Sequence, residues 1–234
     1  MIDPKNNYTK MQKNFYGEKK ANEMASVDHR HHNANPDYWD VLLEPITSDP
    51  THWNRLKALD FGCGTGRNIK NLLGLSAWER VDGVDISGFN LRNADDLLRM
   101  DGLKNFKLYK NNGIDLDVLP KNEYDFIMST IVLQHIAVYD IRFSLLKGMF
   151  DALKSGGVLS FQMGFGDNGH GKADYHANDY DAKGTNSKHD VIVTDPKQIS
   201  DDLEKIGFTQ WFYTTKNPFS DGHQQWIFFK AIKP

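Results

Sequence analysis

The chain has 234 residues, of which 39% are hydrophobic and 12% aromatic, with a net charge of −3 and a single cysteine. This apolar content argues against a disordered chain, and one cysteine excludes an internal disulfide and a thiolate zinc cluster. No basic stripe is present, which argues against a nucleic-acid partner. No apolar run is long enough to span a membrane, and the first residues lack a signal-like apolar core, so we expect a soluble, cytoplasmic protein.

The amino-terminal region, residues 1–49, is predicted to form a helical cap ahead of a single domain at 50–234. Four large side chains recur there at spacings of three and four, the pattern of one helix face: Tyr8, Met11, Phe15 and Tyr16. A second helix is predicted to begin near Pro36, with Asn35 as its cap. Such a helix pair could cover a binding pocket or pack against a second copy, so a monomer and a homodimer both stay open.

A glycine-rich turn follows the first predicted strand, residues 57–61. The strand carries Asp60 near its end and runs into glycines at alternate positions, Gly62, Gly64 and Gly66. Glycines remove side chains from a strand-to-helix turn, so a ligand can lie against bare backbone. The amides at the start of the next helix, predicted over 68–75, favour a negative group on that ligand.

The spacing of these glycines excludes two common nucleotide-binding motifs. A dinucleotide fingerprint would need a small residue at Arg67 or Ile69, depending on which glycine begins it. A P-loop would need Lys-Ser or Lys-Thr after the glycines, and neither follows. The pattern that remains is D-x-G-x-G-x-G, beginning at Asp60. A glycine-rich turn without any ligand is the alternative interpretation.

The second predicted strand, residues 81–85, ends in an acid. In a doubly wound sheet this strand ends beside the first glycine turn, where the carboxylate of Asp85 can accept hydrogen bonds from a ribose diol. The alternative is that Asp85 or Ser87 caps the following helix.

Strands and helices continue to alternate, which indicates a parallel sheet with right-handed crossovers. A strand at 106–110 runs into Asn112, and another, from Tyr124, runs towards His135. A polar segment at about 166–190 is expected to stay outside the core, as a lid over substrate or as a solvated loop. A helix over 195–206 and two antiparallel strands follow, whose aromatic residues are expected in the core: Trp211, Phe212, Tyr213, Trp226, Phe228 and Phe229.

These motifs, in this order, resemble those of class I S-adenosylmethionine-dependent methyltransferases over residues 53–164. The resemblance implies an α/β fold: a Rossmann-like, doubly wound sheet, mostly parallel with an antiparallel last strand, and with helices on both faces. It implies S-adenosyl-L-methionine as cofactor and methyl transfer to nitrogen or oxygen of a small-molecule acceptor. A methyltransferase for tRNA or protein, and a binding protein without turnover, are the alternatives.

The resemblance also assigns the site. The glycine turn would hold the amino-acid end of the cofactor, Ile86 and the Asn112 loop would enclose adenine, and Ser129 and Thr130 would approach the methionine. The expected cofactor residues are Asp60, Gly62, Cys63, Gly64, Gly66, Arg67, Asp85, Ile86, Asn112, Gly113, Ile114, Ser129 and Thr130. Cys63 is expected to pack in the turn rather than to react, and Arg30 or Arg67 to pair with the cofactor carboxylate.

Two residues are candidates for chemistry. His135 follows the fourth strand on the loop that edges the methyl pocket, and imidazole can accept a proton near neutral pH. A structural role for His135, bonding backbone at a helix start, is the alternative. Tyr16 could lie beside the sulfonium, where an aromatic face attracts positive charge. The neighbouring His29, His31 and His32 lack a carboxylate shell, so we expect no metal.

Overall fold

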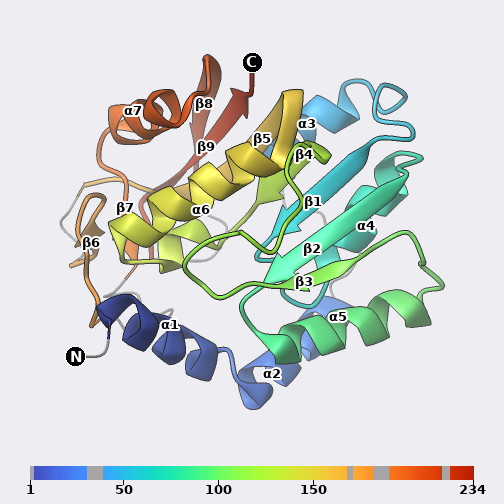
Figure 1. Cartoon of the computed structure of the whole chain (residues 1–234), viewed down its shortest axis with the longest axis horizontal. Helices are drawn as coiled ribbons and strands as arrows, with labels where there is room; N and C mark the ends of the chain where they lie inside the picture. Colours follow the sequence, from blue (N-terminus) through green and yellow to red (C-terminus); the bar gives the residue numbers. More distant parts are fainter. Residues whose placement is uncertain (1–2, 31–38, 168–170, 182–189, 218–221) are drawn as a thin grey trace.

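The computed structural model describes residues 3–30, 39–167, 171–181, 190–217 and 222–234. Helices and strands alternate through most of this chain (Figure 1). In chain order the elements are α1 (Pro4–Phe15), α2 (Glu18–Arg30), α3 (Trp39–Thr47), β1 (Lys57–Phe61), α4 (Arg67–Leu75), β2 (Arg80–Asp85), α5 (Gly88–Met100), β3 (Leu108–Lys110), β4 (Tyr124–Ser129), η1 (Leu133–His135), α6 (Tyr139–Ala152), β5 (Leu153–Phe165), β6 (Ala173–Asp174), β7 (Val191–Ile192), α7 (Pro196–Ile206), β8 (Gln210–Lys216) and β9 (Gln225–Ile232).

Seven of these strands form one sheet in the order β3-β2-β1-β4-β5-β9-β8. Strands β1 to β5 pair in parallel, whereas β9 lies between β5 and β8 and runs antiparallel to both. This confirms the predicted doubly wound sheet with its antiparallel last strand. The strand order reverses at β1, so the carboxyl ends of β1 and β4 open a crevice there, where open α/β sheets bind ligands.

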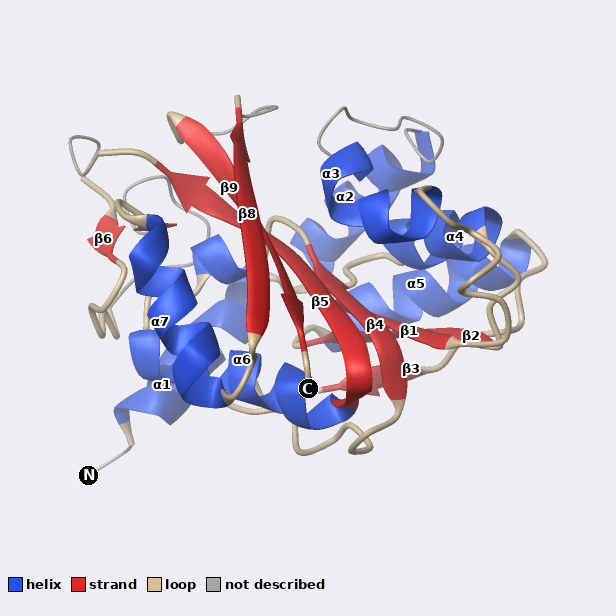
Figure 2. Ribbon diagram, turned by 90° about the horizontal axis from the view of Figure 1, so that it is seen from above, coloured by secondary structure: helices blue, strands red, loops and turns tan. Residues whose placement is uncertain are grey.

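Helices cover both faces of the sheet (Figure 2). Helices α3, α4 and α5 lie on one side, and α1, α6 and α7 on the other. Apolar side chains from each helix layer pack against the strands in two clusters. Helix α7 shows how local sequence sets these boundaries: Asp195 and Gln198 form a capping box at its start, and Gly207 ends it.

The amino-terminal helices occupy two different positions. Helix α3 packs on β5 and β9, with Trp39, Leu42 and Ile46 fully buried, so it belongs to the helix layer of the sheet. Helix α2 instead packs against α5, and α1 buries Tyr8 beside the loop after β4. Only α1 and α2 therefore remain to cover the crevice.

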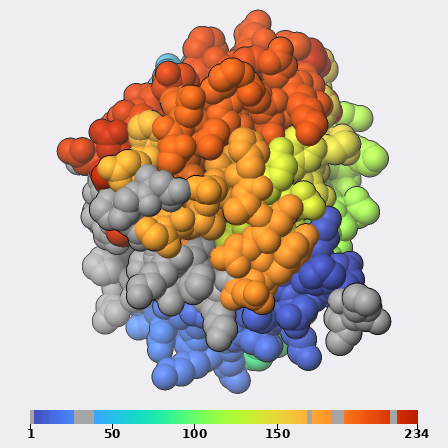
Figure 3. Space-filling view, turned by 90° about the vertical axis from the view of Figure 1, so that its left-hand side faces the viewer, coloured from blue at the N-terminus to red at the C-terminus, as the bar shows by residue number. Residues whose placement is uncertain are grey.

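The polar segment after β5 is partly built into the core, contrary to expectation. Tyr175 is buried, its hydroxyl donates to Asp202 on α7, and its carbonyl accepts a hydrogen bond from Arg142 on α6. Lys172 and Asp190 are buried as well. Figure 3 shows this segment, in orange, on the surface between the blue amino-terminal helices and the red-orange carboxyl-terminal elements. The polar composition of the segment led to a wrong prediction because its buried polar side chains have hydrogen-bond or ion-pair partners inside the protein.

The aromatic residues of the last two strands divide between core and surface. Trp226, Phe228 and Phe229 on β9 are buried, as predicted. Phe212 and Tyr213 on β8 are 64% and 56% exposed, so their predicted place in the core is wrong. The physical reason is that β8 is the outer strand of the sheet and has a neighbour on one side only.

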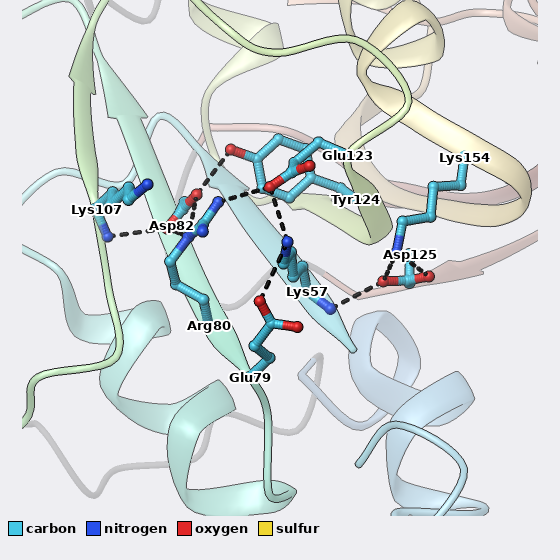
Figure 4. A network of polar contacts seen from close by, with 9 residues as sticks. All are labelled: Lys57, Glu79, Arg80, Asp82, Lys107, Glu123, Tyr124, Asp125 and Lys154. Atoms are coloured by element: carbon cyan, nitrogen blue, oxygen red, sulfur yellow. Dashed lines mark hydrogen bonds and ion pairs between the residues drawn. The ribbon is translucent and has the colours of Figure 1, made fainter. Parts of the chain in front are cut away.

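The amino ends of the strands are joined by a network of charged side chains (Figure 4). Asp82 is fully buried and accepts hydrogen bonds from Arg80, from the Tyr124 hydroxyl and from the Lys107 amide. Glu123 accepts from both Arg80 and Lys57. Burial raises the pKa of Tyr124, and the negative charge of Asp82 raises it further. Asp82 thus pairs with a cation on its own strand, β2, and Glu123 with cations on β1 and β2.

Candidate functional site

A cavity of about 440 Å³ lies at the carboxyl ends of β1, β2 and β4. Its floor is the glycine turn after β1, and its sides come from the loops after the other strands. The amino-terminal helices complete the enclosure with five side chains: Tyr8, Gln12, Tyr16, Lys20 and Met24. Its size falls within the usual range of small-molecule and cofactor sites.

The glycine turn has a conformation that only glycine adopts without strain. Gly62, Gly64 and Gly66 have φ angles of +73°, +52° and +86°. A Cβ atom on Gly62 would lie 2.3 Å from a methyl carbon of Val132, on the loop after β4. Gly62 and Gly64 line the cavity with backbone, whereas Gly66 begins α4 and packs on Leu98, away from the cavity lining.

The acid at the end of β2 faces this turn. One carboxylate oxygen of Asp85 accepts the Gly64 amide at 3.0 Å, and the other accepts the Ser87 amide at 2.7 Å. Asp85 is 7% exposed and lines the cavity, and burial raises its pKa although these amides oppose the shift. The predicted alternatives therefore coexist: Ser87 is the helix cap, while Asp85 presents its carboxylate to the cavity.

The loop after β3 places Asn111, and not the predicted Asn112, in the cavity lining. Asn112 is exposed, and its side chain accepts the Ile114 and Asp115 amides of its own loop. Asn111, buried beside it, lines the cavity instead. Gly113 also lines it, and a Cβ there would lie 2.4 Å from a side-chain carbon of Ile86. Along this loop, residues inside and outside the cavity lining alternate: Asn111 and Gly113 belong to the lining, whereas Asn112 and Ile114 do not.

The loop after β4 brings Thr130 to the cavity and leaves Ser129 behind it. Ser129 is fully buried within the sheet. Ile131 follows with a φ of +56° and donates its amide to the Gln162 side chain at 2.8 Å. Gln162 also donates to Gln134, which is fully buried. Asp60 is likewise enclosed beneath the glycine turn, 3.5 Å from the Asn68 amide nitrogen.

The polar atoms that line the cavity are incompletely satisfied by the protein. Within the described ranges, the side-chain oxygens of Asn111 and Thr130 have no hydrogen-bond partner although both atoms are buried. Buried polar atoms normally have partners, because leaving one unpaired costs about 1–3 kcal/mol. Both residues line the cavity, so these atoms lie close to any polar ligand in it.

The candidate catalytic residues meet at this cavity. His135 and Tyr16 both line it. The ring Nδ1 of His135 lies 2.9 Å from a carboxylate oxygen of Asp190, so its partner is a side chain rather than helix-start backbone. The Tyr16 carbonyl accepts the Ser87 hydroxyl, which ties the α1–α2 junction to the β2 loop. Cys63 is buried in the turn, and burial raises the pKa of its thiol well above the ordinary value.

Several lining residues were not predicted from the sequence. Gln12 comes from the helix predicted around Tyr8, and Lys20 and Met24 come from α2, which was not predicted; no motif reveals where either helix docks. Trp226 was expected only in the core, yet it also borders the cavity, together with the predicted Arg67. The guanidinium of Arg67 stacks 5.3 Å from the centre of the Trp39 ring.

Two further properties concern the described part of the chain alone. Within it, no group of three metal-ligating side chains comes together, and the side chains of His29, His31 and His32 lie outside it. No described helix is long and apolar enough to cross a membrane.

The chain is similar to known proteins both in sequence and in fold. Residues 59–159 match a family model described as a methyltransferase domain. No curated protein sequence matches the chain. Among solved structures, a phosphoethanolamine N-methyltransferase 2 from Haemonchus contortus, in complex with S-adenosyl-L-methionine, is 18% identical with a TM-score of 0.63. That alignment covers 84% of this chain but 53% of the other, so the chain spans about half the length of that protein.

Two similar structures match over nearly their whole length. An S-adenosylmethionine-dependent methyltransferase from Clostridium acetobutylicum ATCC 824 is 19% identical, with a TM-score of 0.64 over 91% of this chain and 99% of that one. DhpI, solved as a complex with SAH, is 18% identical, with a TM-score of 0.62 over 97% of each chain. At such identities the structures establish the fold, while the family model matches the sequence itself. Residues 59–159 are thus similar to a methyltransferase domain, and the chain has the fold of solved S-adenosylmethionine-dependent methyltransferases.

Proposed function

We propose that the protein transfers the methyl group of S-adenosyl-L-methionine to a nitrogen or oxygen atom of a small-molecule acceptor. The observation that carries this proposal is the single cavity that joins the glycine turn to His135 beneath α1 and α2. A cavity roofed by two helices suits a small acceptor better than a folded RNA or protein. An RNA or protein acceptor, and binding without turnover, are outcomes that the experiment below separates.

The residues present fit the cofactor. The bare backbone at Gly62 and Gly64 leaves room for an amino-acid group, and Lys20 and Arg67 supply positive charge for its carboxylate. Asp85 retains acceptor capacity for ribose hydroxyls. The unpaired side-chain oxygen of Asn111 is a suitable acceptor for an exocyclic amino group. We therefore assign the adenine edge to Asn111, in place of Asn112.

The protein itself contributes to the reaction in three ways: it holds the two reactants in place, it limits access of water to them, and it removes a proton from the acceptor. When bound, the cofactor supplies a methyl group on a sulfonium that is transferred by direct displacement. Helices α1 and α2 cover part of the cavity, which limits the access of water and helps to hold the two reactants in place. An amine or hydroxyl acceptor loses a proton as it is methylated. His135 lines the cavity and is placed to take that proton.

Incubation with cofactor carrying a labelled methyl group tests the acceptor class. The protein is mixed with a cell extract divided into small-molecule, RNA and protein fractions, and with phosphoethanolamine, the compound named for the Haemonchus enzyme, as a first defined probe. We expect label in the small-molecule fraction. Label confined to RNA or protein would refute a small-molecule acceptor. Absence of label from every fraction, although the cofactor binds, would refute the proposal that the protein is an active methyltransferase.

Calorimetric titration with S-adenosylhomocysteine tests the cofactor assignment separately. Asp85→Ala removes a charged hydrogen-bond acceptor, and such bonds contribute about 1.5–3 kcal/mol, so affinity should fall roughly 10- to 100-fold. Asp95→Ala, in the exposed Arg99–Asp95 pair on α5, is the matched control and should leave affinity unchanged. Equal affinities in both variants would refute the ribose contact.

A further inference from the structure

We infer that Asp190 is a positioning residue that sets the tautomer of His135, so that the polar segment after β5 contributes directly to the reaction site. The inference rests on the proposed function, because it concerns how His135 takes a proton. It starts from a pair that neither the motifs nor the family match point to: a buried carboxylate, 55 positions later in the chain, on the ring of the cavity histidine.

The chemistry of the two partners fixes which ring nitrogen carries the proton. An ionised carboxylate can only accept a hydrogen bond, so the Nδ1 atom of His135, 2.9 Å from Asp190, must donate. A neutral imidazole has one N–H, and the other nitrogen, Nε2, then keeps a lone pair. His135 lines the cavity, so that lone pair is the basic group available to an acceptor there. Proton removal by Nε2 leaves an imidazolium, which the carboxylate stabilises.

The surroundings of Asp190 favour this arrangement. Asp190 is 5% exposed, and its second carboxylate oxygen lies 3.8 Å from the buried ammonium of Lys172. The lysine compensates the charge of the acid without competing for the oxygen that faces His135. Lys172 and Asp190 flank the short pairing of β6 with β7, and the Ala173 amide donates to the Asp190 carbonyl. The pairing of β6 with β7 therefore holds Lys172 close to Asp190.

The main chain at His135 is held from two other elements. From α1, the Tyr8 hydroxyl donates to the His135 carbonyl and accepts the Ala137 amide at 2.9 Å, while Gln12 donates to that hydroxyl. From α6, the guanidinium of Arg142 donates to the Ile136 carbonyl. Burial raises the pKa of Tyr8 to about 12, so its phenol stays protonated. With the backbone fixed on both sides, the bond to Asp190 determines the orientation of the ring.

Long-range ¹H–¹⁵N NMR of the imidazole nitrogens tests the inference on the full-length protein, with and without S-adenosylhomocysteine. We expect the Nδ1–H tautomer for His135 in the parent protein. In Asp190→Asn the amide NH₂ can donate to Nδ1, so the Nε2–H tautomer should appear. Asp190→Glu should restore the Nδ1–H form. An Nε2–H tautomer in the parent, or an unchanged tautomer in Asp190→Asn, would overturn the assignment.

The tautomer is read without turnover, so this result stands or falls independently of the proposed function. Where methyl transfer is measured, Asp190→Asn should lower kcat by about 10²-fold with KM nearly unchanged, within the range that general base catalysis contributes. Asp181→Asn, an exposed acid in the same polar segment, is the matched control and should behave as the parent. The double variant Asp190→Asn/His135→Ala should be no slower than His135→Ala alone, because the two residues act as a unit. Additive losses would contradict the inference.

Discussion

The two ends of the central sheet are built on opposite principles. At the amino ends, the buried Asp82 is matched by Arg80, and the partly exposed Glu123 is matched by Lys57 and Arg80. At the carboxyl ends, Asn111 and Thr130 keep buried oxygens without a partner in the described chain, and glycines replace side chains. One end stabilises the fold by satisfying its polar groups, whereas the other leaves hydrogen-bonding capacity for a ligand. The comparison predicts that mutations at the two ends separate stability from affinity.

The largest expected effect is at the amino end. Asp82→Ala leaves Arg80 without its bidentate partner and should lower the free energy of unfolding by about 3–5 kcal/mol, as when one member of a buried ion pair is removed. Urea denaturation measures the loss, and S-adenosylhomocysteine affinity of the folded fraction should not change. The exposed Asp95→Ala control should cost roughly 0–1 kcal/mol. Similar losses in the two variants would contradict the role of burial.

The glycine turn should respond in both properties. Gly62→Ala places a methyl group against Val132 and should cost about 1–3 kcal/mol of stability through overpacking, with at least a roughly tenfold loss of S-adenosylhomocysteine affinity. Gly102→Ala is the matched control, because Gly102 has a similar φ of +75° but open space around its Cβ position. Its cost is backbone strain alone, about 1–2 kcal/mol, and affinity should be retained. Calorimetric titration with S-adenosylhomocysteine measures the affinity of both variants. Equal affinities would refute the proposal that the glycine turn holds the cofactor.

Two adjacent asparagines give the sharpest test of the contrast. Asn111→Ala removes the unpaired side-chain oxygen of a residue that lines the cavity, and it should weaken S-adenosylhomocysteine binding by about 0.5–1.5 kcal/mol with little loss of stability. Asn112→Ala removes a cap on the Ile114 and Asp115 amides and should lower stability by about 1 kcal/mol while affinity is kept. Reversed effects would return the adenine contact to Asn112.

The smallest effects are expected in the pH dependence of stability, with opposite signs at the two ends. Burial raises the pKa of Asp85 above its ordinary 3.8, so the folded state binds more protons and stability falls as pH rises above 3.8. Burial alone would raise the pKa of Glu123 too, but hydrogen bonds from Lys57 and Arg80 lower it below 4.5. Its stabilisation is therefore present above pH 4.5 and is lost as pH falls.

Unfolding of Asp85→Asn and Glu123→Gln between about pH 3 and pH 7 measures this difference. The stability of Asp85→Asn relative to the parent should increase with rising pH. The deficit of Glu123→Gln should shrink as the solution becomes acidic. Parallel curves for the two variants would contradict the comparison.

The sequence predicts the sheet well because its signals are local. Gly62, Gly64 and Gly66 mark a turn whose backbone angles exclude other residues, and the capping residues of α7 fix that helix within a residue. The site is predicted less completely because its walls come from distant parts of the chain. Nothing near His135 in the sequence indicates Asp190, and helical periodicity at Tyr8 predicts a buried face without showing what it contacts. A one-residue shift, from Asn112 to Asn111, lies beyond any strand-end signal.

The single cysteine of the chain has a practical consequence. Cys63 lies in the glycine turn, buried, and its thiol packs beside the Cβ position of Gly83. Cys63 is only 5% exposed and its thiol has a raised pKa, so it should react with alkylating reagents mainly when its surroundings open. Because no second cysteine competes for reagent, the alkylation rate of the unmodified protein reports directly how often the turn is uncovered. The rate of alkylation of Cys63 therefore measures how often the glycine turn opens.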